Sequence, residues 1–558
     1  MTPSQEKREF FTTDSEDISE ALVMDEMGFP RAWLEYMAEL LSPDEWSAFL
    51  ATFAESPAKG LLLNVNRIHN LTKPNCRRLK DFLEPLETVS WNEQGYYLPE
   101  GMRASATDWY EAGAFYLQDP SAMLPAQVLG AKPGEWILDL CAAPGGKAAG
   151  IANDMASQGV LVANEIDVKR CRALLHNCER LGLFNCVITN ETPERLADIM
   201  PERFDRILVD APCSGEGLFR RQPSAMVHWL EFGPEQCCQV QLKILQAAWR
   251  LLRPGGVLVY STCTFSQLEN EDVVEKFLTL NPDAVCEDAH LFLPSVTGVS
   301  TGIGTANADA MVRVWPHHGA GDGQFCARLR KAGNKVETVE QESVIQSLGA
   351  SANAPMHPTR SFKKVDTEQK RRRKKHRSRI RQPKSHSSII SPPDAFRHFF
   401  QNCFTGSENL PSAKLYNEII SNDRLLVVRG EHLNGVRWDL IPYLNKLKWI
   451  KPGIYLGTLH EGQKKSNFRP SQALLRLFTA VDFLQYIDLT LAADHLQAYL
   501  SGNTLDLTEI KLVEQKGDLN AQEAESNWLP VCVNGLSLGW TQLGGRMLKN
   551  ELPAGWRR

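Results

Sequence analysis

The chain has 558 residues, of which 43% are hydrophobic and 23% charged, with a formal net charge of −6. This length is too great for one ordinary domain, and the composition is typical of a globular protein. The net charge excludes a uniformly basic nucleic-acid binder. No apolar run approaches the ~20 residues that span a bilayer, and residues 1–7 contain no apolar signal core, so we expect a cytoplasmic protein.

The ends of the chain differ from its middle. Residues 1–29 are polar and acidic, and we expect a loose arm. Residues 30–115 begin with apolar residues at helical spacing and continue with a predicted strand at 61–66, a helix at 73–83 and a strand at 88–91. They predict a helical and small α/β module. Residues 333–391 are rich in charge and predict a flexible linker, whereas residues 392–558 are globular in composition again.

Residues 116–332 alternate strands with helices. Short β-rich apolar runs lie at 136–140, 159–165, 204–210 and 256–260. Such runs with helices between them predict an α/β fold with a doubly wound parallel sheet that is covered on both faces. Runs at 311–315 and 324–329 flank a glycine-containing turn and predict a hairpin at the edge of this sheet.

A loop of small residues follows the first of these strands. The motif DLCAAPGGK spans residues 139–147, and Glu165 ends the next strand. Ligands of doubly wound sheets bind beyond the carboxyl ends of the strands, where small residues permit close approach and a helix N-terminus binds a carboxylate. The motif is not G-x-G-x-x-G, which argues against a dinucleotide.

Two further strands end in cysteine motifs. DAPCSGEG spans residues 210–217 and STCT spans 261–264, so Cys213 and Cys263 each follow a predicted apolar strand. A thiolate there can act as a covalent nucleophile. The residues alone do not decide which of the two attacks. A redox pair is an alternative, but it leaves the 139–147 loop unexplained.

With these motifs, residues 60–330 resemble the Sun/Nop family of S-adenosylmethionine-dependent RNA cytosine-5 methyltransferases. Residues 533–550 are similar to the tail of the bacterial subgroup that acts on 16S ribosomal RNA, type F. The resemblance implies a Rossmann-like methyltransferase sheet, an N-terminal RNA-contacting module and a PUA-like RNA-binding fold near the end. It implies that S-adenosylmethionine is bound by Cys141, Ala142, Ala143, Pro144, Gly145, Gly146, Lys147, Glu165, Asn190 and Asp210. Asn190 stands where the family commonly has an aspartate.

The resemblance also implies catalytic roles. Cys263 would attack the cytosine, Cys213 would release the covalent adduct, Asp210 would hold the base and Lys147 would orient this cluster. The expected substrate is 16S ribosomal RNA in the decoding region, free or within the small subunit or its precursor, and the expected enzyme is a monomer without a metal. Alternatives are the same chemistry on transfer RNA, or a non-catalytic donor-binding assembly factor, against which the two intact cysteines argue.

Three polar clusters lie outside these motifs. Residues 363–384 carry a dense Lys/Arg run, which is either a solvated linker or an RNA tether that acts through counterion release. Arg220 and Arg221 are either a solvated pair or an RNA contact near the site. His317 and His318 have no partner ligands at metal spacing, and we expect them to be ordinary loop residues.

Overall fold

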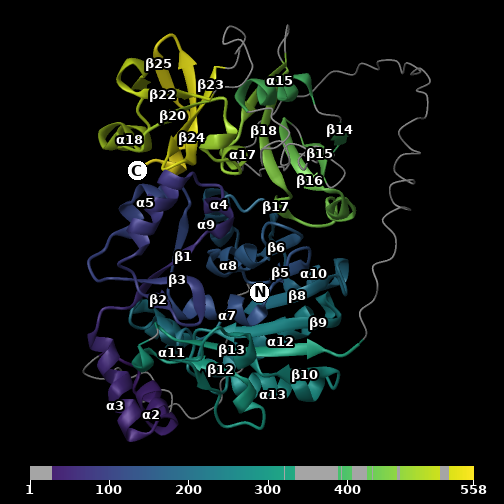
Figure 1. Ribbon diagram of the computed structural model, residues 1–558. Helices are drawn as coiled ribbons and strands as arrows, with labels where there is room; N and C mark the ends of the chain where they lie inside the picture. The colour runs from purple at the N-terminus through teal and green to yellow at the C-terminus, as the bar shows by residue number, and fades with distance from the viewer. Residues whose placement is uncertain are drawn as a thin grey trace, which may run out of the picture.

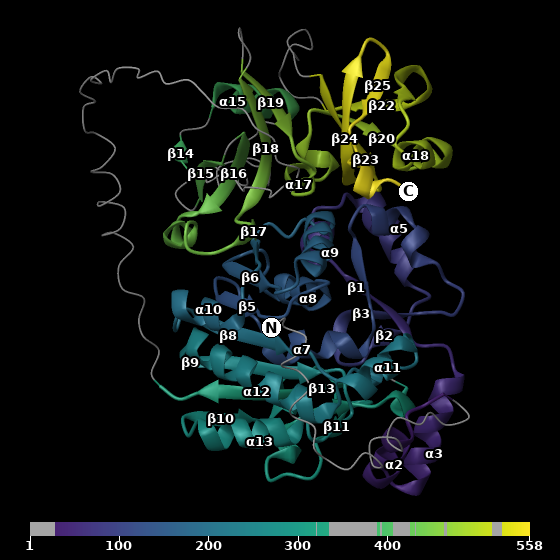
Figure 2. The same ribbon diagram turned by 180° about the vertical axis from the view of Figure 1, so that it is seen from behind.

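The computed structural model describes residues 28–319, 321–333, 388–390, 393–404, 424–429, 431–461, 466–515 and 527–558. The basic run at 363–384 lies outside the described residues, as does nearly all of the expected arm. Figures 1 and 2 show four sheets, with the largest in the lower half of the molecule and the two C-terminal sheets above it. None of the helices in the described ranges is both long enough and apolar enough to cross a bilayer.

The largest sheet has ten strands in the order β11-β12-β13-β9-β8-β5-β6-β7-β17, with β10 paired to β13. Its five central strands are parallel: β9 (Leu252–Thr262), β8 (Phe204–Asp210), β5 (Trp136–Asp139), β6 (Val160–Asn164) and β7 (Cys186–Thr189). The flanking strands are β10 (Ala284–Glu287), β11 (Ser300–Thr301), β12 (Val312–Val314), β13 (Gln324–Lys331) and β17 (Trp449–Lys451). The predicted doubly wound sheet and the β12–β13 hairpin are both present.

Helices cover both faces of this sheet because its central strands are apolar on both sides. One face packs against α7 (Leu124–Leu129), α8 (Gly146–Asp154) and α9 (Val168–Arg180). The other face packs against α10 (Pro193–Ile199), α12 (Pro234–Leu251) and α13 (Glu271–Leu280). The two cores hold the strands rigidly, so the loops at their carboxyl ends start from fixed positions.

The N-terminal part forms two separate pieces. Helices α2 (Arg31–Leu40) and α3 (Pro43–Ala51) pack around Phe219, Phe265 and Trp315. A four-stranded sheet in the order β2-β3-β1-β4 follows. Its elements are β1 (Lys59–Leu63), α4 (Val65–Ile68), α5 (Lys73–Leu83), β2 (Thr88–Val89), β3 (Asn92–Leu98), α6 (Asp108–Glu111) and β4 (Phe115–Gln118). The predicted strand at 61–66 was wrong beyond Leu63, where the chain turns into α4.

Two sheets make up most of the C-terminal part. The first contains β14 (Ser388–Ile390), β15 (Arg424–Arg429), β16 (His432–Arg437), β18 (Ile454–Glu461) and β19 (Ser466–Pro470), with α15 (Asp394–Cys403) and α17 (Gln472–Leu475). The second contains β20 (Gln485–Asp488), β21 (Leu505–Asp506), β22 (Lys511–Glu514), β23 (Trp528–Val533), β24 (Leu536–Gly544) and β25 (Met547–Asn550), with α18 (Ala493–Leu500). Between β16 and β18 of the first sheet, β17 leaves this part and pairs with β7 of the large sheet.

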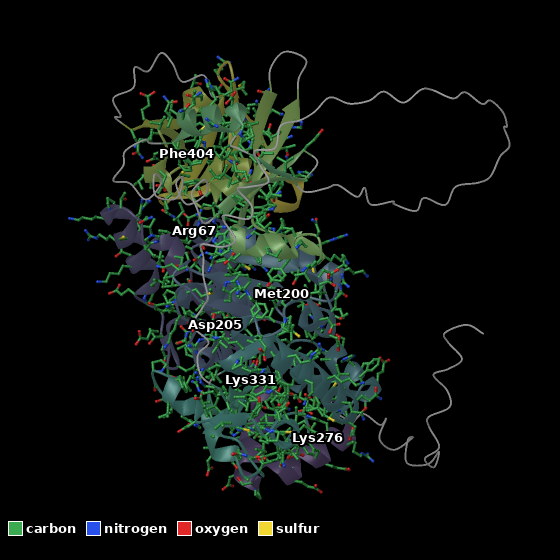
Figure 3. The ribbon with its side chains drawn as sticks, turned by 90° about the vertical axis from the view of Figure 1, so that its right-hand side faces the viewer. Arg67, Met200, Asp205, Lys276, Lys331 and Phe404 are labelled. Carbon is green, nitrogen blue, oxygen red and sulfur yellow. The ribbon has the colours of Figure 1, made fainter. Side chains whose placement is uncertain are left out.

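The N-terminal and C-terminal parts share one hydrophobic core. Side chains of β1, β4 and α5 pack with side chains of β20, β23, β24 and α18. Arg67 of α4 lies buried at this seam and is labelled in Figure 3. Its guanidinium donates to the backbone carbonyls of Ala112 at 3.0 Å, Phe478 at 3.3 Å and Ser537 at 2.7 Å, and also to that of Arg476. One side chain therefore joins segments from both parts of the chain.

We expect Arg67→Met to destabilise the protein by about 3 kcal/mol, because it leaves several buried carbonyls without donors. Urea denaturation should show an earlier transition than in the wild type. Arg77→Met, an exposed position on α5, is the matched control and should leave the transition unchanged. Equal transitions for the two variants would contradict a joining role for Arg67.

Candidate active site

The loops after β5, β6, β8 and β9 converge at the carboxyl edge of the parallel strands. They carry the DLCAAPGGK loop, Glu165, the Cys213 loop and the Cys263 loop, respectively. Because β5 pairs with both β6 and β8, and β8 pairs with β9, these four loops are neighbours in space. The structure thus places the predicted donor loop and the two cysteine motifs around one site.

The loop after β5 is held from behind by α9. Arg170 donates to the carbonyl of Ala143 at 2.7 Å, and Asn177 donates to that of Pro144 at 3.0 Å. Gly145 has a φ of 112°, in the region that favours glycine, and it caps the N-terminus of α8. The first N–H groups of α8 are thereby presented by a fixed loop of small residues, which suits a carboxylate.

Asp139 is a buried acid whose carboxyl oxygens accept no hydrogen bond of normal geometry within the described residues. Burial raises its pKa from 3.8 to about 8, and the nearby Asp210 contributes in the same direction. Native proteins seldom leave buried polar groups unpaired, so such a group is a functional candidate. The sequence analysis did not single out Asp139, because a strand-end aspartate alone does not reveal that it lacks a partner.

Glu165 is buried, and its two oxygens have different surroundings. Oε1 accepts from the backbone N–H of Asp167 at 2.9 Å. Oε2 lies 3.3 Å from Arg170 and accepts no hydrogen bond of normal geometry from the described residues. One carboxylate oxygen is therefore left for a ligand.

Asn190 uses its side-chain amide within the protein. Its Nδ2 donates to the carbonyls of Glu165 and Ile166, both at 2.8 Å, and its Oδ1 accepts from Nζ of Lys448. The backbone of Lys448 also accepts from Asn190 at 2.9 Å and donates to Oε1 of Glu191 at 2.6 Å. Asn190 supports the Glu165 turn, and a direct contact between Asn190 and a donor stays a prediction. Lys448 comes from the segment before β17, which no local motif linked to this site.

Cys213 and Cys263 face one another, with their sulfur atoms 3.4 Å apart. Both thiols are free and partly accessible. The hydrogen bond shared with Cys263, together with burial, raises the pKa of Cys213 well above its usual value. Cys213 therefore keeps its proton more readily than an exposed thiol does.

Hydrogen bonds join the two cysteine loops. The N–H of Gly217 donates to the carbonyl of Cys263 at 2.9 Å, the N–H of Phe265 donates to Glu216 at 2.8 Å, and the hydroxyls of Ser214 and Thr264 lie 2.8 Å apart. A Cβ on residue 217 would lie 2.6 Å from the carbonyl oxygen of Cys263, so only glycine fits. These contacts fix the distance between the thiols.

Asp210 and Lys147 form an ion pair of 2.8 Å at the edge of the same pocket. Asp210 also accepts from the hydroxyl of Ser261 at 2.8 Å and from the amide of Gln324 at 3.2 Å. Burial disfavours the charge of Lys147, but Asp210 together with Cys263 and Asp139 outweighs this effect, and the pKa of Lys147 is raised. Lys147 also interacts electrostatically with Cys263, so one cation connects the carboxylate with the thiol pair.

Arg220 and Arg221 form ion pairs inside the protein. Arg220 lies 3.5 Å from Asp322, and Arg221 pairs with both Asp322 and Asp119. The expectation of an ordinary solvated pair was therefore wrong, whereas an RNA contact by these arginines stays a prediction. A second residue that the sequence analysis missed is Glu269, which is buried and accepts from the N–H of Ser214 at 3.0 Å. Burial raises the pKa of Glu269 to about 7.

The pKa of Asp139 leads to a testable stability effect. The folded protein keeps a proton on Asp139 that the unfolded chain loses, so this stabilisation is complete below about pH 4 and is lost as the pH rises to about 8. Asp139→Asn cannot ionise, and its melting temperature relative to the wild type should rise across this window and level off above it. Asp81→Asn, an exposed position on α5, should show a difference that is constant with pH. A constant difference for Asp139→Asn as well would contradict the raised pKa.

Three family models match the chain. The model described as 16S rRNA methyltransferase RsmB/F matches residues 126–330, the N-terminal domain of 16S rRNA methyltransferase RsmF matches residues 29–120, and the methyltransferase RsmF PUA domain matches residues 487–558. Curated relatives include ribosomal RNA small subunit methyltransferase F from Erwinia tasmaniensis, which is 33% identical over 310 residues that make up 54% of this chain and 63% of the relative. The relative of the same name from Aeromonas salmonicida is 39% identical over 254 residues, or 44% of this chain and 52% of the relative.

The chain thus aligns with less than two thirds of the length of these relatives. A solved methyltransferase homolog protein from Pyrococcus horikoshii is 27% identical and covers 52% of this chain and 92% of its own, with a TM-score of 0.44. The matched segments coincide with the N-terminal pieces, the large sheet and the last sheet of the structure. The chain belongs to the RsmB/F methyltransferase family and carries the N-terminal and PUA domains of its RsmF branch.

Proposed function

We propose that this chain transfers a methyl group from S-adenosylmethionine to C5 of a cytosine in 16S ribosomal RNA. The observation that carries the proposal is the pair of thiols 3.4 Å apart, which lies beside the Asp210–Lys147 ion pair and next to the loop after β5. A pair of thiols alone also suits redox chemistry. The carboxyl oxygens of Asp139 and Glu165 that accept no hydrogen bond of normal geometry lie in the neighbouring loops, and they favour binding of a methyl donor over redox chemistry.

The pocket fits the donor by its chemistry. S-adenosylmethionine, when bound, supplies an electrophilic methyl group on a sulfonium. Oε2 of Glu165 suits the ribose hydroxyls, and the N-terminus of α8 with Gly145 and Gly146 suits the carboxylate. The unpaired oxygens of Asp139 suit the cationic amino group. The remaining proposed donor contacts are Cys141, Ala142, Ala143, Pro144, Lys147, Asn190 and Asp210.

Cys263 is the proposed nucleophile. Its thiolate adds to C6 of the cytosine, which makes C5 electron-rich and able to take the methyl group. Asp210, which Lys147 and Ser261 hold in place, is positioned to accept hydrogen bonds from the exocyclic amine and the protonated N3 of the base. The Lys147 cation, which forms the ion pair with Asp210, interacts electrostatically with Cys263, which supports this assignment.

Cys213 is the proposed release residue. The proton on C5 leaves to a base, the bond between C6 and the Cys263 sulfur breaks with its electrons returning to sulfur, and the C5–C6 double bond forms again. The proposed base is the Cys213 thiolate, formed when Cys213 gives its proton to solvent after Cys263 has become bonded to C6. Its position 3.4 Å from the Cys263 sulfur places it beside the adduct.

The RNA part of the proposal rests on the relatives. Their names refer to the small ribosomal subunit, which favours 16S ribosomal RNA over transfer RNA, and the match at residues 487–558 is a PUA domain. The target cytosine must be unpaired or flipped out of a helix to reach the thiols. We propose a monomeric cytoplasmic enzyme that methylates the decoding region, with no metal in the reaction.

The two cysteines should give opposite phenotypes. Cys263→Ala should abolish methylation without forming a covalent complex. Cys213→Ala should accumulate an RNA–protein complex that survives a denaturing gel, because addition proceeds and release fails. Cys76→Ala is the matched control, since Cys76 is an exposed thiol far from the site in the sequence, and it should behave as the wild type. A complex with Cys263→Ala in place of Cys213→Ala would reverse the two roles.

Glu165 gives a separate test of donor binding. Removal of a carboxylate that makes charge-assisted hydrogen bonds costs about 2–3 kcal/mol. Calorimetry on Glu165→Ala should therefore show donor affinity reduced by roughly 30- to 150-fold. Glu194→Ala, an exposed position on α10, should bind as tightly as the wild type. Unchanged affinity of Glu165→Ala would remove Glu165 from the donor site.

A further inference from the structure

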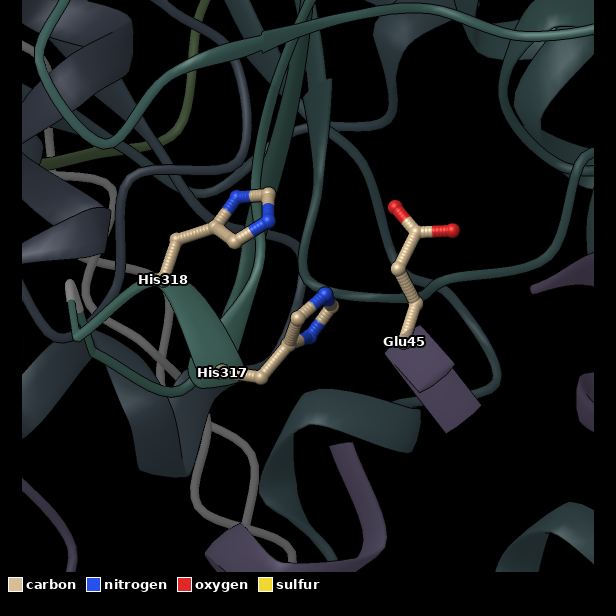
Figure 4. Close-up of side chains that lie close together, drawn as sticks. All are labelled: Glu45, His317 and His318. Carbon is tan, nitrogen blue, oxygen red and sulfur yellow. The ribbon is translucent and has the colours of Figure 1, made fainter. Parts of the chain in front are cut away.

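Three metal-ligating side chains meet away from the thiol pair. Glu45 lies in the first turn of α3, and His317 and His318 lie in the turn after β12. One ligand atom from each lies within 4.8 Å of the others. Figure 4 shows the carboxylate facing the two imidazole rings. The sequence offered no third ligand near the two histidines, and the fold supplies one from far along the chain.

His317 is the unusual member of this group. Both of its ring nitrogens are buried, and neither has a hydrogen-bond partner within the described part of the chain. The ring packs against Phe49 and Trp315, with centroid distances of 5.8 and 5.9 Å. Leaving a buried polar group unpaired costs about 1–3 kcal/mol. A ligand that accepts the lone pair of one nitrogen would remove part of this cost.

The other two residues have atoms left for a ligand. The backbone N–H and the hydroxyl of Ser42 both donate to Oε2 of Glu45, which leaves Oε1. The hydrogen bonds with Ser42 lower the pKa of Glu45, so it is an anion at neutral pH. His318 contacts the hydroxyl of Ser300 through Nδ1 at 3.2 Å, which leaves Nε2.

We propose that Glu45, His317 and His318 form a binding site for Zn²⁺ that fastens α3 to the turn after β12. Two imidazoles and one carboxylate are a common zinc ligand set, with water as the fourth ligand. Tetrahedral ligands of zinc lie about 3.3 Å apart, so the three ligand atoms must approach one another by at most about 1.5 Å. The Glu45 side chain is exposed, which leaves room for this movement.

The position of the site indicates a structural role. The ring centroids of Phe49, in α3, and Phe265 lie 5.1 Å apart. The ring of Phe265 stacks on that of Trp315, with a centroid distance of 5.3 Å. Phe265 lies two residues after Cys263 and is bonded to the Cys213 loop through Glu216. A metal ion here would hold α2 and α3 against the loop that carries the proposed nucleophile.

Cobalt binding to the metal-stripped full chain tests the site, under reducing conditions with Co²⁺ as the probe. The thirteen cysteines are competing ligands. Cobalt bound to nitrogen and oxygen gives visible ligand-field bands without the near-ultraviolet band of a cobalt–thiolate bond. We expect one such site per chain in the wild type, and an affinity at least about 10-fold lower in both His317→Ala and Glu45→Gln. Zn²⁺ should compete for this site and raise the melting temperature of the wild type but not of His317→Ala or Glu45→Gln.

Two matched controls accompany these variants. His69→Ala removes an exposed histidine, and Glu39→Gln neutralises an exposed carboxylate on α2, so both should bind cobalt as the wild type does. Glu45 is exposed, and Glu45→Gln therefore keeps the test valid if His317→Ala fails to fold. Absence of a nitrogen–oxygen cobalt site in the wild type, or an unchanged site in Glu45→Gln, would overturn the proposal.

Discussion

The candidate site depends on the hydrogen bonds between the loops after β8 and β9. Three hydrogen bonds join these loops. They connect Gly217 with Cys263, Phe265 with Glu216, and Ser214 with Thr264. Because β8 and β9 are adjacent parallel strands between two packed cores, the loops begin from fixed points. The distance between the two sulfurs is therefore a property of the backbone, and no side-chain rearrangement is needed to assemble the pair.

The turn after Glu165, on the proposed donor side of the site, is supported by the C-terminal part of the chain. The segment before β17 comes from the C-terminal part, and its Lys448 holds Asn190, which in turn holds the turn after Glu165. Arg195 adds a contact to the carbonyl of Lys446 at 2.9 Å. Arg67 fastens the N-terminal module to the same C-terminal part. Parts that flank the catalytic sheet in sequence thus position its pocket.

Much of this arrangement could be predicted from the sequence. The apolar runs, the small-residue loop and the two cysteine motifs are local signals, and each lies in the predicted element. The paired thiols were predictable because adjacent parallel strands end at one edge of the sheet. The roles of Asp139 and Arg221 were not predictable, since they depend on which groups surround each side chain. Asp139 accepts no hydrogen bond of normal geometry from the described residues, and Arg221 forms ion pairs with Asp119 and Asp322.

The long-range contacts were beyond the reach of sequence patterns. Lys448 is one lysine among many, and only the pairing of β17 with β7 places it beside Asn190. Glu45 forms an ordinary capping box in sequence, and only the packing of α3 on Trp315 and Phe265 brings it to His317. Such contacts depend on how distant segments pack, which composition and periodicity do not encode.

The central claim is that Cys263 forms the covalent bond to the base while Cys213 stays free. RNA that contains 5-fluorocytidine tests it directly, because fluorine at C5 cannot leave as a proton and the adduct is trapped after methyl transfer. Peptide mass spectrometry of the digested complex then identifies the modified cysteine. The account predicts the nucleotide on the peptide that contains Cys263. A nucleotide on the peptide that contains Cys213 would contradict it.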